Sequence, residues 1–315
     1  MTIKLGVIMD PIHAIKFVKD STLAMLAEAQ KRQYQIYYME QKDLFSQQGK
    51  TLASLRPLRV FDNPGKWFEL GGTEVFALDQ LDVILMRKDP PFDMNFIYTT
   101  YLLDEVERNG CLVVNRPQSL RDCNEKFFAT EFPQCCPPLL VDQNHGRLKD
   151  FIDQHLDIVV KPLDGMGGQS IFRIKKDDAN TNVILETLTR FGQTPIMAQK
   201  FIPQVSAGDK RILLINGKPI PHGLARVPAK GELRGNLAAG GTGKVVPLTE
   251  RDYWICEQVG PSLVAKGLIF VGIDVIGDYL TEINVTSPTC IREIDKDSGL
   301  NISAALLDCI ELQLT

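Results

Sequence analysis

A glycine-rich stretch, KPLDGMGGQSIFRI at residues 161–174, is the first candidate for chemistry in this sequence. A Walker-type phosphate loop carries its lysine after the last glycine, whereas Lys161 precedes the glycines. A dinucleotide-binding loop leads from a strand into a helix, but residues 170–174 have the β-branched and aromatic composition of a strand. Because residues 157–160 are also strand-like, we expect a flap between two strands, whose backbone N–H groups could lie along a triphosphate. An ordinary hairpin turn is the alternative.

Oxygen-bearing side chains gather near residue 280. Glu282 and Asn284 are two residues apart on a predicted strand and therefore share a face, while Asp274 lies on the preceding strand. A three-residue loop, 277–279, would place Asp274 opposite Glu282 on that face, whereas a two-residue loop would turn it to the other face. In the first register two carboxylates and an amide oxygen converge, which suits a hard cation such as Mg²⁺ better than zinc. The alternative is that Asp274 or Glu282 faces solvent.

Lysine and arginine side chains and a second glycine-rich stretch are further candidates for a functional site. Lys161 follows three apolar strand residues, so we expect its charge to have a partner. Lys126, Arg211 and Arg226, each taken singly, have the pattern of solvated surface charges. Residues 228–243 contain five glycines and few apolar anchors, a composition typical of a mobile lid that excludes water from bound substrates. A surface loop without a function is the alternative.

The first third of the chain alternates strands and helices. Apolar strands are predicted at 3–9, 36–39, 83–86 and 111–114, and helices at 21–32 and 93–109. This alternation predicts a parallel sheet covered by helices in the doubly wound style. Residues 42–80 are less periodic, and we expect them to include an irregular insertion.

Strand pairs around turns replace this pattern after residue 115. Hairpins are predicted at 157–175, at 211–220 around Asn216-Gly217, and at 269–285, with helices at 249–266 and 304–314. We place domain boundaries near residues 122 and 201, which gives segments 1–122, 123–201 and 202–315.

Composition excludes several classes of protein. The chain has 315 residues, 44% apolar and 23% charged, with a net charge of −4. This balance provides no basic field for nucleic acid or an anionic membrane. The N-terminal apolar run is too short for a signal segment, so we expect a cytoplasmic protein. Seven cysteines without a C-x-x-C pair predict reduced, structural thiols, including Cys290.

Several blocks together carry a resemblance to a known family. The sequences KPLDGMGG from Lys161, RGNLAAGG from Arg234 and TEINVTSPTCIRE from Thr281 resemble the ATP-grasp ligases, and among them the bacterial glutathione synthetases. LMRKDPPFD from Leu85 and RPQSLRDCNEK from Arg116 extend the likeness into the first third. The resemblance covers essentially the whole chain and is weakest at residues 42–80. It implies an ATP-grasp fold behind an N-terminal doubly wound, substrate-binding domain.

The resemblance also implies a reaction and roles for individual residues. The reaction joins γ-glutamylcysteine and glycine to glutathione through an acyl phosphate, with ATP converted to ADP and phosphate. The implied ATP contacts are Lys126, Lys161, Gly165, Met166, Gly167, Gly168, Gln199, Lys200, Phe201, Ile202 and Asp209. The implied catalytic residues are Arg211, Arg226 and Arg234; the substrate contacts are Arg226, Asn284, Ser287 and Thr289; and the ligands of Mg²⁺ or Mn²⁺ are Asp274, Glu282 and Asn284. Family members suggest a homotetramer acting on small molecules, with no nucleic-acid or membrane partner.

Three other readings of the same residues compete with this one. The chain could be another ATP-grasp carboxylate–amine ligase, for example one that joins two amino acids. It could also be a synapsin-like module that binds ATP without turning it over. The strand predicted after Gly168 argues against a Rossmann dehydrogenase.

Overall fold

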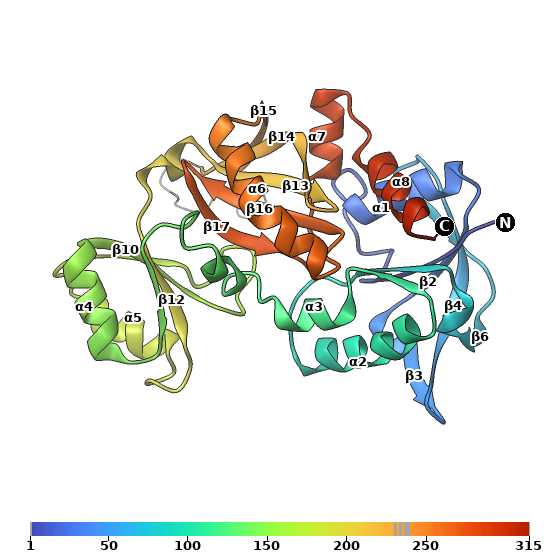
Figure 1. Cartoon of the computed structure of the whole chain (residues 1–315), viewed down its shortest axis with the longest axis horizontal. Helices are drawn as coiled ribbons and strands as arrows, with labels where there is room; N and C mark the ends of the chain where they lie inside the picture. The colour runs from blue at the N-terminus through green and yellow to red at the C-terminus, as the bar shows by residue number, and fades with distance from the viewer. Residues whose placement is uncertain (1, 230–231, 233–234, 236–239, 315) are drawn as a thin grey trace.

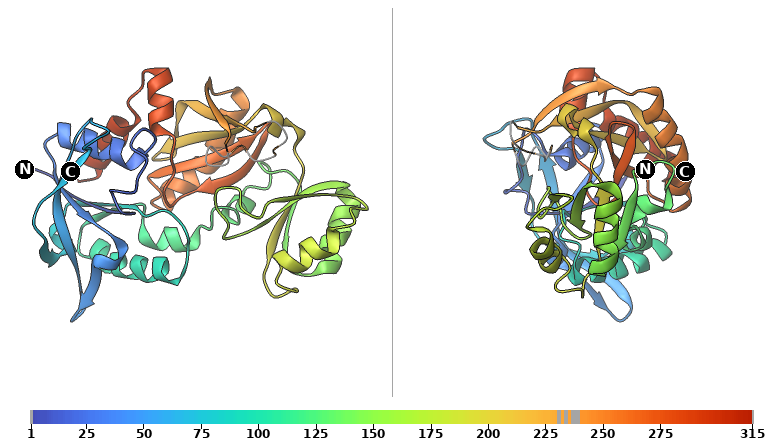
Figure 2. Two further views of the ribbon diagram at one scale, coloured as in Figure 1. Left: turned by 180° about the vertical axis from the view of Figure 1, so that it is seen from behind. Right: turned by 90° about the vertical axis from the view of Figure 1, so that its left-hand side faces the viewer.

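A computed structural model describes residues 2–229, 232, 235 and 240–314, and it arranges their strands in three sheets (Figure 1). The sheets contain eight, four and five strands and follow one another along the chain. Both ends of the chain lie at the same side of the molecule, beside the N-terminal sheet (Figure 2). No helix within the described ranges has the length and apolar character needed to cross a membrane.

The N-terminal sheet has a parallel centre with helices on both faces. Its strand order is β2-β1-β7-β8, with β1 Lys4–Met9, β2 Gln35–Met39, β7 Val83–Arg87 and β8 Leu112–Val114. Helix α1, Ser21–Lys31, shares a core with Val7, whereas α2, Met94–Arg108, shares a core with Ile8. Neighbouring residues of β1 therefore bury opposite faces, which confirms the doubly wound prediction. Helix α3, Pro117–Asp122, leads out of this sheet.

The expectation that residues 42–80 include an irregular insertion is wrong. This segment forms four strands that extend the sheet in antiparallel fashion: β3 Leu44–Gln47, β4 Lys50–Val60, β5 Phe68–Leu70 and β6 Glu74–Ala77. Strand β4 pairs with β2 at Tyr37–Pro57, so the sheet is mixed rather than wholly parallel. Buried residues alternate along β4 on each side of Arg56-Pro57, but the alternation shifts by one residue there, so the sequence shows no continuous period of two. Short 3₁₀ turns η1, Gln41–Asp43, and η2, Leu78–Gln80, flank these strands.

The central sheet forms a separate lobe with its own core. Its antiparallel order is β11-β10-β12-β9, with β9 Leu139–Asp142, β10 Asp157–Pro162, β11 Phe172–Lys175 and β12 Ile196–Lys200. Helices α4, His145–His155, and α5, Thr181–Leu188, cover it and were not predicted from the sequence. Its apolar cluster contains only residues from this lobe, which lies to one side in Figure 1.

The C-terminal sheet, by contrast, shares its cores with the N-terminal one. Its order is β15-β14-β13-β16-β17, with β13 Asp209–Ile215, β14 Lys218–Val227, β15 Thr242–Pro247, β16 Phe270–Ile276 and β17 Tyr279–Asn284. Helices α6, Glu250–Ala265, α7, Ile291–Ser298, and α8, Ile302–Leu314, pack around it. Helix α6 begins with a capping box formed by Thr249 and Asp252, and the predicted Asn216-Gly217 hairpin is present. Turns η3, Phe128–Glu131, and η4, Pro203–Ala207, connect the lobes.

Candidate active site

The glycine-rich loop has the predicted strand–loop–strand form. Strand β10 ends at Pro162 and its antiparallel neighbour β11 begins at Phe172, so residues 163–171 form a flap between adjacent strands. Gly167 and Gly168 have φ values of 63° and 80°, a region that glycine occupies without strain. The ammonium of Lys126 donates to the carbonyl oxygen of Gly165 at 2.5 Å. A basic side chain therefore already contacts the base of the flap.

The hairpin of β16 and β17 brings Asp274 and Glu282 to one face, as predicted, but with a different loop from the one expected. Ile276 pairs with Tyr279, so the loop has two residues, and the three-residue loop considered from the sequence is wrong. A register shift follows: Val275 pairs with Leu280 but Asp274 pairs with Glu282. This β-bulge adds one residue to β17 and restores the pairing that a strict two-residue hairpin would have lost. Asp274 and Glu282 consequently share a face.

Two arginines hold the carboxylate of Asp274. Arg211 donates to both of its oxygens, at 2.5 and 3.0 Å, and Arg226 Nη2 lies 3.0 Å from Oδ2. Asn284 Nδ2 donates to the same Oδ2 at 3.2 Å, which leaves the amide oxygen of Asn284 available to another ligand. Burial alone would raise the pKa of Asp274, but the two guanidinium groups outweigh it and hold the pKa below its usual range.

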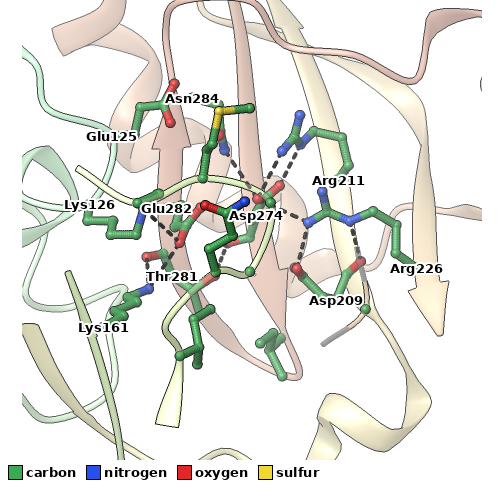
Figure 3. A pocket seen from close by; sticks show the side chains of 18 of the residues that line it. Glu125, Lys126, Lys161, Asp209, Arg211, Arg226, Asp274, Thr281, Glu282 and Asn284 are labelled. Atoms are coloured by element: carbon green, nitrogen blue, oxygen red, sulfur yellow. Dashed lines mark hydrogen bonds and ion pairs between the residues drawn. The ribbon is translucent and has the colours of Figure 1, made fainter. Parts of the chain in front are cut away.

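Two lysines from the other side of the cleft hold Glu282. Lys161 Nζ lies 3.2 Å and Lys126 Nζ 3.7 Å from Glu282 Oε1 (Figure 3). Burial opposes ionisation of Glu282, yet these ammonium groups lower its pKa overall. Lys161 therefore has the partner expected from its apolar strand. Each of the two carboxylates thus lies between positively charged side chains. Such a site can bind an anionic ligand and a cation together.

Two buried polar atoms in the cleft have no hydrogen-bond partner in the described part of the chain. They are Oδ1 of Asp209 and Nε2 of Gln199. Burial raises the pKa of Asp209 to about 6, although Arg226 Nη2 donates to its other oxygen at 2.6 Å. Buried polar groups are normally hydrogen-bonded, so these two atoms are suited to a polar ligand.

A cleft of about 320 Å³ joins these elements. Nearly every residue that the resemblance implied lines it: Lys126, Lys161, Gly165, Met166, Gly167, Gly168, Gln199, Lys200, Phe201, Ile202, Asp209, Arg211, Arg226, Asp274, Glu282, Asn284, Ser287 and Thr289. Arg234 and half of the predicted lid at 227–242 lie outside the described residues. Gly235 is described, and it lines the cleft.

Some cleft residues were missed from the sequence. Glu125 accepts a hydrogen bond from Thr286 Oγ1 at 2.8 Å, and burial raises its pKa. Its position beside Lys126 was the only local signal. Arg173 lies on β11 beyond the flap and also lines the cleft.

Cys290 is buried at the cleft wall, and burial raises the pKa of its thiol, which disfavours a nucleophilic thiolate.

The donor set suits a divalent cation of the hard class. Carboxylate oxygens of Asp274 and Glu282 and the amide oxygen of Asn284 come from one sheet and line one cleft. Over the described ranges, no three His, Cys, Asp or Glu side chains gather in a cluster that could hold a metal. The third donor would thus be an amide, as the sequence indicated.

Comparison with known proteins places the chain in a family. Family models described as the N-terminal and ATP-grasp domains of prokaryotic glutathione synthetase match residues 3–121 and 125–299. Glutathione synthetase of Pseudomonas putida is 60% identical over 100% of this chain and 99% of its own length. That of Vibrio parahaemolyticus is 55% identical over 98% of each chain.

Solved structures agree on the fold. D-Cycloserine synthetase DcsG has a TM-score of 0.67 at 12% identity, covering 98% of this chain and 99% of its own. D-Alanine–D-alanine ligase of Bacillus anthracis, complexed with ATP, has a TM-score of 0.60 at 16% identity, covering 99% and 97%. At identities this low, the likeness shows that the chain has the ATP-grasp fold and does not indicate its substrates. The two domain matches and the full-length relatives, by contrast, show the family: the chain belongs to the prokaryotic glutathione synthetases.

Proposed function

We propose that the cleft joins γ-glutamylcysteine to glycine, giving glutathione, and that the reaction passes through an acyl phosphate. The chain is an ATP-dependent ligase of glutathione synthesis, as its family membership establishes. The observation that carries the proposed mechanism is the position of the flap, its two lysines and the oxygen-bearing hairpin around a single cleft.

ATP would bind between the central and C-terminal sheets. Lys126, Lys161 and the flap 165–168 would contact the phosphates, because backbone N–H groups and ammonium groups suit phosphate oxygens. Residues 199–202 would receive the adenine. Asp209, with its unpartnered buried oxygen, would bind the ribose.

Asp274, Glu282 and Asn284 would hold the divalent cation that the family uses, which we propose is Mg²⁺ or Mn²⁺. A bound cation would supply charge neutralisation on the phosphate oxygens. The arginines beside it would act on the same charge from the protein side. Arg211 and Arg226 are fixed by Asp274 and Asp209, so their guanidinium groups need no reorganisation when the phosphoryl group transfers.

The chemistry requires two steps because a carboxylate is a poor electrophile. In the first, an oxygen of the cysteinyl carboxylate attacks the γ-phosphorus, the bond to the β-phosphate oxygen breaks, and ADP leaves. In the second, the amine of glycine attacks the acyl carbon, loses a proton, and expels phosphate. We assign the oxyanion of this step to Arg226, and a catalytic contact to Arg234. Ser287, Thr289 and Asn284 would contact the substrates.

The acyl phosphate must be kept from water, which gives the lid at 227–242 a function. We propose that the chain divides near residues 122 and 201, and that it acts as a homotetramer in the cytoplasm.

A phosphate-release assay tests the proposed reaction. Phosphate should be released from ATP when γ-glutamylcysteine and glycine are both present, and glutathione should appear in equal amount. Release driven equally by D-alanine pairs would indicate a different carboxylate–amine ligase. ATP binding without any turnover would indicate a binding module.

A further inference from the structure

Arg173 makes a contact that the proposed reaction does not use. Its guanidinium carbon lies 3.6 Å from the centroid of the Phe201 ring, which is stacking distance for a cation–π pair. Phe201 directly follows β12, within the segment proposed to receive adenine, and both residues line the cleft.

The guanidinium is fixed by a carboxylate on the neighbouring strand. Arg173 donates to both oxygens of Asp157, from Nε at 2.8 Å and from Nη2 at 2.5 Å. Such a fork holds the guanidinium plane in one orientation, which a lysine could not reproduce. Asp157 also fixes the backbone of Phe201, because its carbonyl oxygen accepts from Phe201 N at 2.9 Å.

These contacts connect three strands: Asp157 lies on β10, Arg173 lies on β11, and Phe201 directly follows β12. Strands β10 and β11 are the two arms of the flap, while Phe201 belongs to the base-binding segment. The backbone bond alone would leave the ring free to rotate about its side-chain torsions. The stacked guanidinium removes that freedom on the face that it covers.

We propose that Arg173 is a positioning residue for the nucleotide base: anchored by Asp157, it fixes the Phe201 ring and holds segment 199–202 in the conformation that accepts adenine. The inference rests on the proposed function of the cleft as an ATP site. It assigns Arg173 no contact with the reacting phosphate or carboxyl groups. Its loss should therefore weaken ATP binding and leave the chemical steps intact.

Variants at residue 173 test the inference, with ATP affinity measured by direct calorimetric binding as well as by kinetics. R173M and R173K should each raise the Kd and the KM for ATP about tenfold, the size of one partly buried cation–π contact. The kcat at saturating ATP and the KM values for γ-glutamylcysteine and glycine should stay at parental levels. Discrimination between ATP and GTP should fall, which loss of stability alone would not cause.

A matched control exists in the same lobe. Arg147 also donates to both oxygens of Asp142 but does not line the cleft, so R147M should leave ATP affinity unchanged. The double variant D157R/R173D restores the ion pair while moving the guanidinium to the other strand. It should regain the melting temperature without regaining ATP affinity.

Three results would overturn the inference: parental ATP affinity in R173M, an equal loss in R147M, or full recovery of affinity in the swapped pair. Because the binding measurement needs no turnover, a parental chain that binds ATP but makes no glutathione would refute the proposed reaction and leave this test valid.

Discussion

Replacing Glu282 with glutamine separates the proposed catalytic role from folding. The substitution keeps the size of the side chain and one oxygen but removes the negative charge that faces Lys161 and Lys126 at 3.2 and 3.7 Å. If Glu282 holds the cation beside the phosphates, several kcal/mol of transition-state stabilisation depend on that charge. A loss of about 4 kcal/mol corresponds to a fall in kcat of roughly 10³-fold.

The cost to folding should be much smaller. The Glu282 side chain is 21% exposed and opens onto the cleft. Lys126 and Lys161 are themselves buried, but each keeps a hydrogen bond to a backbone carbonyl oxygen, of Gly165 and Thr281 respectively. We expect a change of about 1 kcal/mol in the free energy of unfolding, in the range of a partly exposed ion pair. For a chain of this size, that corresponds to a fall in melting temperature of about 2 °C.

Asp252→Asn provides the matched control. Asp252 is a fully buried carboxylate that pairs with Lys210 and caps α6, and it does not line the cleft. Its loss should lower the melting temperature more than Glu282→Gln does, because breaking a buried pair costs about 3–5 kcal/mol. Turnover per folded molecule should stay parental. Steady-state rates across a Mg²⁺ titration, with thermal denaturation of both variants, make the comparison; rate and melting temperature falling in proportion in Glu282→Gln would refute the reasoning.

Three further substitutions test other parts of the account. In Gly235→Pro, even a Cβ would lie 2.2 Å from the carbonyl oxygen of Arg226, so the segment must shift; we expect more than one phosphate released per glutathione, and a ratio of one would contradict the lid. Arg211→Lys cannot reproduce the fork on Asp274, and kcat should fall about 10²-fold; a rate within threefold of the parent would exclude the role. Burial raises the pKa of Asp295 to about 6, so its protonated form favours the fold below pH 4 and that stability is lost as the pH rises through 6. Asp295→Asn should therefore raise the melting temperature by about 1–3 °C at pH 8 and leave it unchanged near pH 3; equal shifts at both pH values would contradict this assignment.

Local patterns predicted those elements whose residues act close together in the sequence. The flap follows from β-branched residues on both sides of the glycines, and the face shared by Glu282 and Asn284 follows from strand periodicity. The bulge opposite Asp274 could not be predicted, because a register shift depends on pairing across the whole hairpin. The sequence therefore predicted correctly that Asp274 and Glu282 share a face, but it predicted a three-residue loop where the hairpin has two residues and a bulge.

Contacts between distant segments explain most of what the sequence did not reveal. The ion pair of Lys126 with Glu282 links residues 156 positions apart, and its existence depends on how the lobes pack. The short helix α7 was missed because only Ile291 and Ile294 of its eight residues are buried. Eight residues with so few apolar positions give too weak a periodic signal for a prediction.

The most direct test of the acyl phosphate measures whether an oxygen atom of the dipeptide carboxylate is transferred to inorganic phosphate. γ-Glutamylcysteine labelled with ¹⁸O in its cysteinyl carboxylate is incubated with ATP, the divalent cation and glycine, and the inorganic phosphate is analysed by mass spectrometry. If the carboxylate oxygen attacks the γ-phosphorus and is then expelled with it, each phosphate should carry one ¹⁸O atom derived from the dipeptide. Unlabelled phosphate formed together with glutathione would contradict the acyl phosphate.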